Sequence, residues 1–272
     1  MKKILFVFDG KHFSNGAFEF IRHLNSLKRV MVTGVFLPAL EDTEFVYSFD
    51  NMSGPYYVSE LPHEEDQTEK SIFYFESLCR QNDIEYKVHS GFTTEVVAEL
   101  KAESRYADLM VIGSKLFYEN LDAETQEDYI EKILHKAECP VLLAPETYSK
   151  PENIVLAYDG SDSSVYAIKQ FAYLFPEYQD LQTLLVYTDT STKNIPDKDN
   201  IQELACHHFN DLVVFKLKLD RGKEFEQWLF TNKHAILIAG AYGRSLFSEM
   251  LHKSFVKEAI QDNHMPVFVT HK

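Results

Sequence analysis

The chain has 272 residues, which is long for one ordinary α/β domain and enough for two of about 130 to 150 residues each. It carries 42 acidic against 27 basic residues, a formal net charge of −15, and such a charge repels nucleic acid and anionic membranes. We therefore expect neither nucleic acid nor a membrane among its partners.

The first apolar run, residues 4–8, follows two lysines and stops at Asp9. It is too short for the apolar core of a secretion signal, and no small-residue cleavage site follows it, so we predict a β-strand. No apolar run in the chain is long enough to cross a bilayer. We expect a cytoplasmic protein.

The two halves of the chain are similar to each other. Residues 4–24 align without a gap with residues 154–174, and the two segments share Ile, Asp-Gly, Ser, Ala and Leu. Residues 107–113 match residues 234–240, and a Cys-Pro-Val near the end of the first half matches a Met-Pro-Val near the end of the second. This is a tandem repeat.

In each copy apolar strands alternate with helical patterns, which is typical of right-handed βαβ crossovers and a parallel sheet. In the first copy we expect strands at 4–8, 30–36, 86–90, 108–113 and 141–144, and helices at 14–27, 64–82, 93–104 and 123–138. In the second copy we expect strands at 153–158, 182–188, 212–218, 235–239 and 267–270, and helices at 162–175, 198–209, 223–232 and 247–262. A short polar join divides the chain into a first domain, 1–148, and a second, 149–272.

Two other features carry less information. Cys79, Cys139 and Cys206 are far apart and show no metal-ligand spacing, so we expect buried, reduced thiols and no metal site. The long connection 38–62 is rich in aromatic residues, which is unusual for a loop. Either it lies over a cleft or binds a partner, or it folds back on its own domain.

The fourth expected strand of the second copy ends in Gly240-Ala-Tyr-Gly243. Backbone amides freed by such a turn, together with the N-terminus of a following helix, suit a phosphate group. The alternative is that both glycines only allow close packing at a tight turn. The first strand of the same copy ends in Asp159-Gly. If these two strands flank the point where the crossovers diverge, Asp159 and Gly240 face each other across it.

Taken in order, the Asp-Gly after strand one, the Gly-x-x-Gly after strand four and the Cys-Pro-Val or Met-Pro-Val last strand resemble the universal stress protein family in its tandem two-domain form. The resemblance covers essentially the whole chain. It implies two tandem, doubly wound, parallel five-stranded sheets of the Rossmann-like, adenine nucleotide alpha hydrolase-like type, with strand order 3-2-1-4-5. It also implies a non-catalytic stress-response protein.

Nucleotide-binding members of the family hold ATP on a glycine-rich loop after strand four. By that resemblance Gly240 and Gly243 match the first two glycines, Ser254 matches the final hydroxyl residue, and Arg244 lies within the loop. Lys253 stands where the third glycine is expected. Its side chain either crowds the amides that would meet a phosphate or supplies a positive charge in their place.

The resemblance also places Ala157, Asp159 and Val186, or a near neighbour of Val186, beside the adenine base. The alternative is structural for all three: Ala157 and Val186 are core residues of their strands, and Asp159 caps the helix that begins near Ser161.

The first half departs from the family pattern. Leu116 replaces the second glycine after Gly113, and the segment 119–128 is acidic, so it would compete with a phosphate for the same helix amides. We expect ATP or another adenine nucleotide in the second domain and no cofactor in the first.

The last strand of each copy is apolar, and we expect it at the edge of its own sheet, where unpaired backbone groups favour pairing with another strand. In the family, domains pair through these strands, so we expect an intramolecular pseudo-dimer of the two domains, and a homodimer of whole chains is a further possibility.

The sequence leads to two candidate functions: a nucleotide-binding module, or a ligand-free scaffold that acts through an unidentified protein partner. Catalysis ranks third, because the sequence has none of the usual phosphate-loop, nucleophile or metal motifs of enzymes.

Overall fold

The computed structural model describes residues 1–9, 13–37, 64–90, 96–113, 136–187, 194–216, 234–240 and 265–270. The first half contains β1 (Lys2–Asp9), α1 (Asn15–Leu27), β2 (Val30–Leu37), α2 (Glu64–Gln81), β3 (Glu85–His89), α3 (Val96–Ser104), β4 (Leu109–Gly113) and β5 (Val141–Ala144). The second contains β6 (Asn153–Tyr158), α6 (Asp162–Leu174), the 3-10 turn η1 (Pro176–Tyr178), β7 (Gln182–Tyr187), α7 (Lys198–His208), β8 (Leu212–Lys216), β9 (Ala235–Gly240) and β10 (Val267–Thr270).

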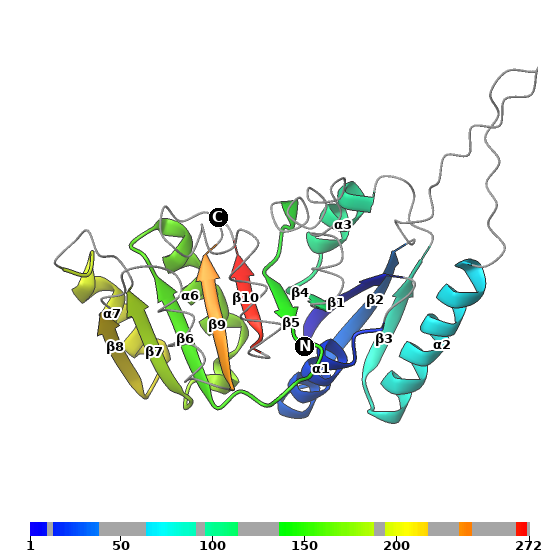
Figure 1. Cartoon of the computed structure of the whole chain (residues 1–272), viewed down its shortest axis with the longest axis horizontal. Coiled ribbons are helices and arrows are strands. Elements are labelled where there is room, and N and C mark those ends of the chain that lie inside the picture. Colours follow the sequence, from blue (N-terminus) through cyan, green and yellow to red (C-terminus); the bar gives the residue numbers. More distant parts are fainter. Residues whose placement is uncertain are drawn as a thin grey trace, which may run out of the picture.

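All described strands lie in one continuous ten-stranded sheet (Figure 1) in the order β3-β2-β1-β4-β5-β10-β9-β6-β7-β8. Within each half the neighbouring strands are parallel, and the expected order 3-2-1-4-5 is confirmed twice. The halves meet where β5 and β10 pair in antiparallel fashion, with Val141 opposite Val269 and Leu143 opposite Val267. The expected pairing of the two last strands within the chain is therefore confirmed.

The predicted strands agree with the observed ones to within two residues at each end. β1 begins two residues before the predicted start, because Lys2 already pairs with Val30 of β2, and residues 217–218 of the predicted strand 212–218 lie outside the described residues. The turn η1 was not expected. The predicted helices 223–232 and 247–262, most of 123–138 and all of the aromatic connection 38–62 lie outside the described residues.

Helices cover both faces of the sheet. One core cluster lies under α1, α2, α6 and α7, and it includes large buried rings such as Phe20, Phe75 and Phe171. The other cluster is mainly aliphatic and includes Leu100 of α3 with Ala137 before β5. This distribution follows from right-handed crossovers. The strands after β1 and β6 are added on one side of them, whereas β4 and β9 lie on the other side. Right-handed crossovers in opposite directions place their helices on opposite faces of the sheet.

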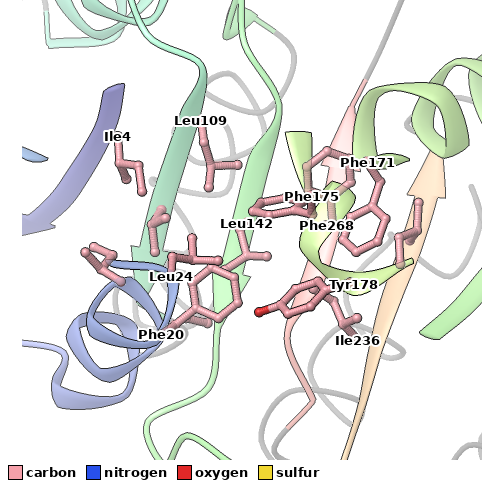
Figure 2. Packing of buried hydrophobic residues seen from close by; sticks show 14 of the residues in the cluster. Ile4, Phe20, Leu24, Leu109, Leu142, Phe171, Phe175, Tyr178, Ile236 and Phe268 are labelled. Atoms are coloured by element: carbon pink, nitrogen blue, oxygen red, sulfur yellow. The ribbon is translucent and has the colours of Figure 1, made fainter. Parts of the chain in front are cut away.

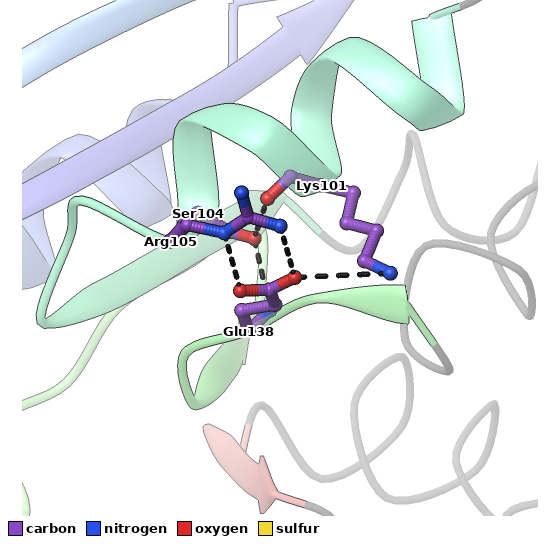
Figure 3. Close-up of polar contacts among 4 residues, drawn as sticks. All are labelled: Lys101, Ser104, Arg105 and Glu138. Atoms are coloured by element: carbon purple, nitrogen blue, oxygen red, sulfur yellow. Dashed lines mark hydrogen bonds and ion pairs between the residues drawn. The ribbon is translucent and has the colours of Figure 1, made fainter.

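A polar cluster joins the end of α3 to the residues before β5 (Figure 3). Arg105 donates two hydrogen bonds to the carboxylate of Glu138, at 2.7 and 2.8 Å, and the Lys101 ammonium lies 3.7 Å from the same group. The buried Ser104 hydroxyl donates to the Lys101 carbonyl and accepts from the Glu138 amide. The hydrogen bonds from Arg105 lower the pKa of Glu138. The cluster fixes where β5 begins, and so the position of the strand that joins the halves.

The two halves also contact each other beside the sheet. Lys2 of β1 forms an ion pair with Glu177 at 3.0 Å, and its ammonium lies 5.0 Å from the centre of the Phe175 ring. The Tyr178 ring stacks against His23 of α1 at 6.2 Å between centroids. Figure 2 shows Tyr178 reaching from η1 toward α1 of the other half. We call these five residues the seam. Within the described ranges no symmetry-related copy of these contacts is present, so the two halves contribute different residues to this part of their contact.

The cysteines are reduced, but only two of the three are buried. Cys79 and Cys139 are buried, and burial raises the pKa of each to about 12. Cys206 is exposed, contrary to the prediction. It lies on α7, whose buried residues are Ile201 and Ala205, and the position next to Ala205 turns about 100° away from the core.

A pair of substitutions on α6 tests the ring-rich core. Phe171 is fully buried and contacts Phe268 of β10 at 5.4 Å between ring centroids, whereas Tyr173 is 58% exposed. Phe171→Ala should lower the free energy of unfolding by about 3 to 5 kcal/mol, because it leaves a cavity. Tyr173→Ala should change it by less than about 0.5 kcal/mol. Urea denaturation followed by circular dichroism measures both, and equal losses would contradict this description of the core.

The seam makes stability depend on pH through His23. Burial lowers the pKa of His23 from its ordinary value of 6.5, and the charges of Lys150 and Arg22 lower it further. The unfolded chain therefore takes up this proton first, and as the pH falls through about 6.5 the folded state loses stability. Between about pH 7.5 and 5.5 the wild type should lose more stability than His23→Gln, in chemical denaturation at each pH. Parallel curves would refute the assignment.

Candidate functional site

Two of the predicted site residues, Asp159 and Gly240, lie at the carboxyl ends of β6 and β9. These two strands are parallel neighbours, and Leu156 pairs with Ile238. Gly240 is two residues beyond Ile238, level with Tyr158, and Asp159 follows Tyr158 directly. The predicted proximity of the first and fourth strands of this half is therefore confirmed. Crossovers leave these strands in opposite directions, and ligands of doubly wound sheets bind at such a point.

Gly240 lies against the first turn of α6. A Cβ atom at this position would come within 2.6 Å of the Ser163 carbonyl oxygen and of the Ser164 nitrogen. Both are backbone atoms that cannot move aside without displacing the helix. The structural role considered for this glycine is therefore present: its lack of a side chain lets β9 approach α6. The close approach also places the strand end next to the amides at the start of that helix.

Asp159 shapes the turn that leads into α6. Its carboxylate accepts hydrogen bonds from the Ser161 amide at 2.8 Å and from the Ser161 hydroxyl at 2.6 Å. Ser161 is the N-cap of α6, and its hydroxyl in turn accepts from the Ser164 amide at 3.2 Å. The cap is thus Ser161, and Asp159 orients it. The side chain of Asp159 is only half-buried, so it can also meet a molecule at the strand ends.

Ala157 and Val186 are core residues as well as site candidates. They pair directly between β6 and β7, and both are buried in the aliphatic cluster. Ala239, next to Gly240 on β9, belongs to the same cluster. These three side chains lie in the core beneath the strand ends and are at most 3% exposed, so the core role considered for Ala157 and Val186 is present.

Tyr158 and Pro196 are site neighbours that sequence analysis missed. The Tyr158 ring is 1% exposed, and its hydroxyl donates to the Pro196 carbonyl at 2.9 Å. Tyr187, at the end of the neighbouring strand β7, has its ring centre 5.6 Å from the Lys216 ammonium. Burial raises the pKa of Tyr158, and the carboxylates of Asp197 and Asp159 raise it further. The one sequence signal was the position of Tyr158 immediately before Asp-Gly.

The first half uses its equivalent glycine in the same structural way. A Cβ at Gly113 would come within 2.6 Å of the Ser14 hydroxyl. Ser14 is the N-cap of α1 and accepts from the Ala17 amide at 3.3 Å. Its hydroxyl also lies 3.5 Å from a carboxylate oxygen of Glu146, in the segment after β5. An acidic side chain is therefore close to the start of this helix, where a phosphate would need positive potential.

Half of the predicted site lies outside the described residues. These positions are Gly243, Arg244, Lys253 and Ser254. Within the described ranges, no group of three or more His, Cys, Asp or Glu side chains is arranged to hold a metal ion. The helices described here include none that is both long and apolar enough to cross a membrane.

Comparison with known proteins identifies the fold. No protein-family model matches the sequence, and no curated protein matches it either. Among solved structures, a universal stress protein from Archaeoglobus fulgidus DSM 4304 matches with a TM-score of 0.66 and 14% identity, over 100% of this chain and 96% of that one. A putative universal stress protein from Pseudomonas aeruginosa UCBPP-PA14 matches with a TM-score of 0.51 and 12% identity, over 100% and 93%. The cytoplasmic domain of a prokaryotic cation chloride cotransporter matches with 0.52 and 11%, over 98% and 94%.

The glycine contacts predict a loss of stability that needs no ligand. In the absence of nucleotide, Gly240→Ala should lower the free energy of unfolding by about 1 to 3 kcal/mol, because the added methyl group overlaps the α6 backbone. Gly113→Ala, the matched variant in the first half, should do the same through Ser14. Thermal and urea denaturation of both variants check this. If Gly240→Ala is as stable as the wild type, the structural role of this glycine is wrong.

Proposed function

We propose that this chain, which has the fold of universal stress proteins, is a non-catalytic stress-response protein whose second half binds ATP or another adenine nucleotide. The supporting observation is the juxtaposition of Asp159 and Gly240 at the carboxyl ends of adjacent strands. One end of the site carries a half-buried carboxylate and the other a glycine beside the first turn of a helix. A nucleoside with donor groups suits the first end and a phosphate chain suits the second.

We assign the nucleoside to Ala157, Asp159 and Val186. The two apolar residues form the buried floor of the strand ends, and the Asp159 carboxylate can accept from the amino group of a base or from a ribose hydroxyl. This carboxylate already accepts two hydrogen bonds from Ser161. Those bonds hold it in place before a ligand arrives, which lowers the entropy cost of binding.

We assign the phosphate groups to the connection after β9. Gly240 begins it, and Gly243, Arg244, Lys253 and Ser254 follow in the sequence. Free amides, a guanidinium, an ammonium and a hydroxyl are all suitable partners of phosphate oxygens. Lys253 stands where the family pattern has an uncharged glycine, so this connection carries one more positive charge for the phosphate groups.

We propose that the first half, residues 1–148, binds no nucleotide and that the second, 149–272, acts alone. Glu146 near the N-cap of α1 supports this difference, because its negative charge repels a phosphate. We also propose a cytoplasmic protein, and the net charge of −15 supports the absence of nucleic-acid and anionic-membrane partners.

A second candidate is a ligand-free scaffold that acts through a protein partner. The observation in its favour is that the site residues have partners within the chain. Gly240 packs on α6, Asp159 orders Ser161, and Ala157 and Val186 belong to the core. In this case the strand ends preserve the fold and the partner binds elsewhere.

Calorimetric titration of the full chain with ATP, ADP and AMP separates the two candidates. We expect one nucleotide per chain. Asp159→Asn should weaken binding about tenfold or more, because a hydrogen bond to a charged group contributes roughly 1.5 to 3 kcal/mol. The asparagine oxygen can still accept from Ser161, so stability should change little.

The matched control is Asp162→Asn, in the first turn of the same helix, which should leave the affinity within about twofold. Two nucleotides per chain would contradict the assignment to the second half alone. No heat and no thermal shift at millimolar nucleotide would favour the scaffold. Mass spectrometry of ligand released from freshly purified protein gives an independent answer.

A further inference from the structure

Two residues that flank Asp159 both contact the segment before α7. Tyr158, on one side, donates its hydroxyl to the Pro196 carbonyl at 2.9 Å. Gly160, on the other side, faces the Pro196 ring so closely that a Cβ there would lie 3.0 Å from the proline Cβ and Cγ atoms. The predicted ligand-binding acid is therefore enclosed between two contacts with one proline, which is more than thirty residues away in the chain.

The backbone on both sides of this contact is in an unusual conformation. Gly160 has a φ of +82°, which glycine adopts readily and other residues rarely do. Asp197, which follows Pro196 and is the N-cap of α7, has a φ of +43° and no capping hydrogen bond from its side chain. A left-handed conformation in a residue other than glycine persists only when its surroundings hold it. Tyr158 and Gly160 contact the preceding residue, Pro196, and so support this backbone from one side.

The Tyr158 hydroxyl is well placed to hold the segment around Pro196. Its ring is 1% exposed at the end of β6, where it also contacts the Tyr187 ring at 6.3 Å between centroids. The ring is thus fixed by the core while its hydroxyl reaches the loop. A buried hydroxyl without a partner is costly, so the hydrogen bond to Pro196 is strongly favoured over separation.

We propose that Tyr158 is a positioning residue for the nucleotide site, and that its hydrogen bond to Pro196 holds the segment before α7 against the Asp159 turn. This inference rests on the proposed function. Tyr158 itself does not touch the ligand. It fixes the backbone on which Asp159 is presented, and it makes Pro196 and Asp197 the neighbouring wall of the nucleoside end.

Tyr158→Phe tests the proposal, because it removes the hydroxyl and keeps the ring. Hydrogen exchange of the full chain without nucleotide should become several-fold faster for the amides at the start of α7, and change little in β6. The ATP affinity should fall roughly fivefold, which corresponds to a loss of about 1 kcal/mol of binding free energy, because the site is less ordered before the ligand binds. The matched control is Tyr178→Phe, another buried tyrosine of the same half, whose hydroxyl has no partner.

The outcomes are distinct. Unchanged exchange at the start of α7 in Tyr158→Phe would overturn the hydrogen-bonded contact itself, whether or not nucleotide binds. Faster exchange with an unchanged affinity would overturn the positioning role. A similar loss of affinity in Tyr178→Phe would also overturn it, because the effect would then be general. A wild type that binds no ATP, ADP or AMP would refute the proposed function and the positioning role together, while the exchange data would still decide the contact.

Discussion

The antiparallel pairing of β5 with β10 is the contact on which the arrangement of this molecule depends. Each strand is apolar and ends its own five-stranded sheet, and an apolar edge with unpaired backbone groups is unstable in water. Pairing the two edges satisfies both at once and makes one sheet from two. The seam and the Glu138 cluster then fix the same junction from the side. The strands β6 and β9 that carry the candidate site belong to this same continuous sheet.

The site itself is built from residues that serve the fold and the proposed ligand together. Gly240 must be small for α6 to pack on β9, and the same contact brings helix amides to the strand end. Asp159 orders the N-cap of α6 and keeps a half-buried carboxylate. Fold and binding are therefore difficult to separate at these positions by large substitutions. Asp159→Asn and Tyr158→Phe separate them because each keeps the shape of the side chain.

Much of the fold could be predicted from the sequence because each strand is an apolar run and the two copies support one another. The repeat of Asp-Gly and of the Pro-Val strands indicated the order of elements along the chain, and the strand order 3-2-1-4-5 came from the resemblance to the universal stress protein family. The Tyr158 contact with Pro196 could not be predicted, since it joins residues far apart in the chain and neither belongs to a motif. The exposure of Cys206 was missed because helix α7 has only a narrow buried face. Whether Gly240 serves packing or a ligand is not a property of sequence alone, because both need the same missing side chain.

Carrying both copies in one polypeptide removes a constraint that a dimer of identical subunits must obey. In such a dimer every substitution occurs in both subunits. A residue that improves one side of the contact must therefore also be compatible with the symmetry-related position on the other side. Here Lys2 contacts Glu177 and His23 contacts Tyr178, and the part of the chain that the structure describes has no symmetry-related copy of either contact. Covalent fusion thus allows the residues on the two sides of the junction to change independently of each other.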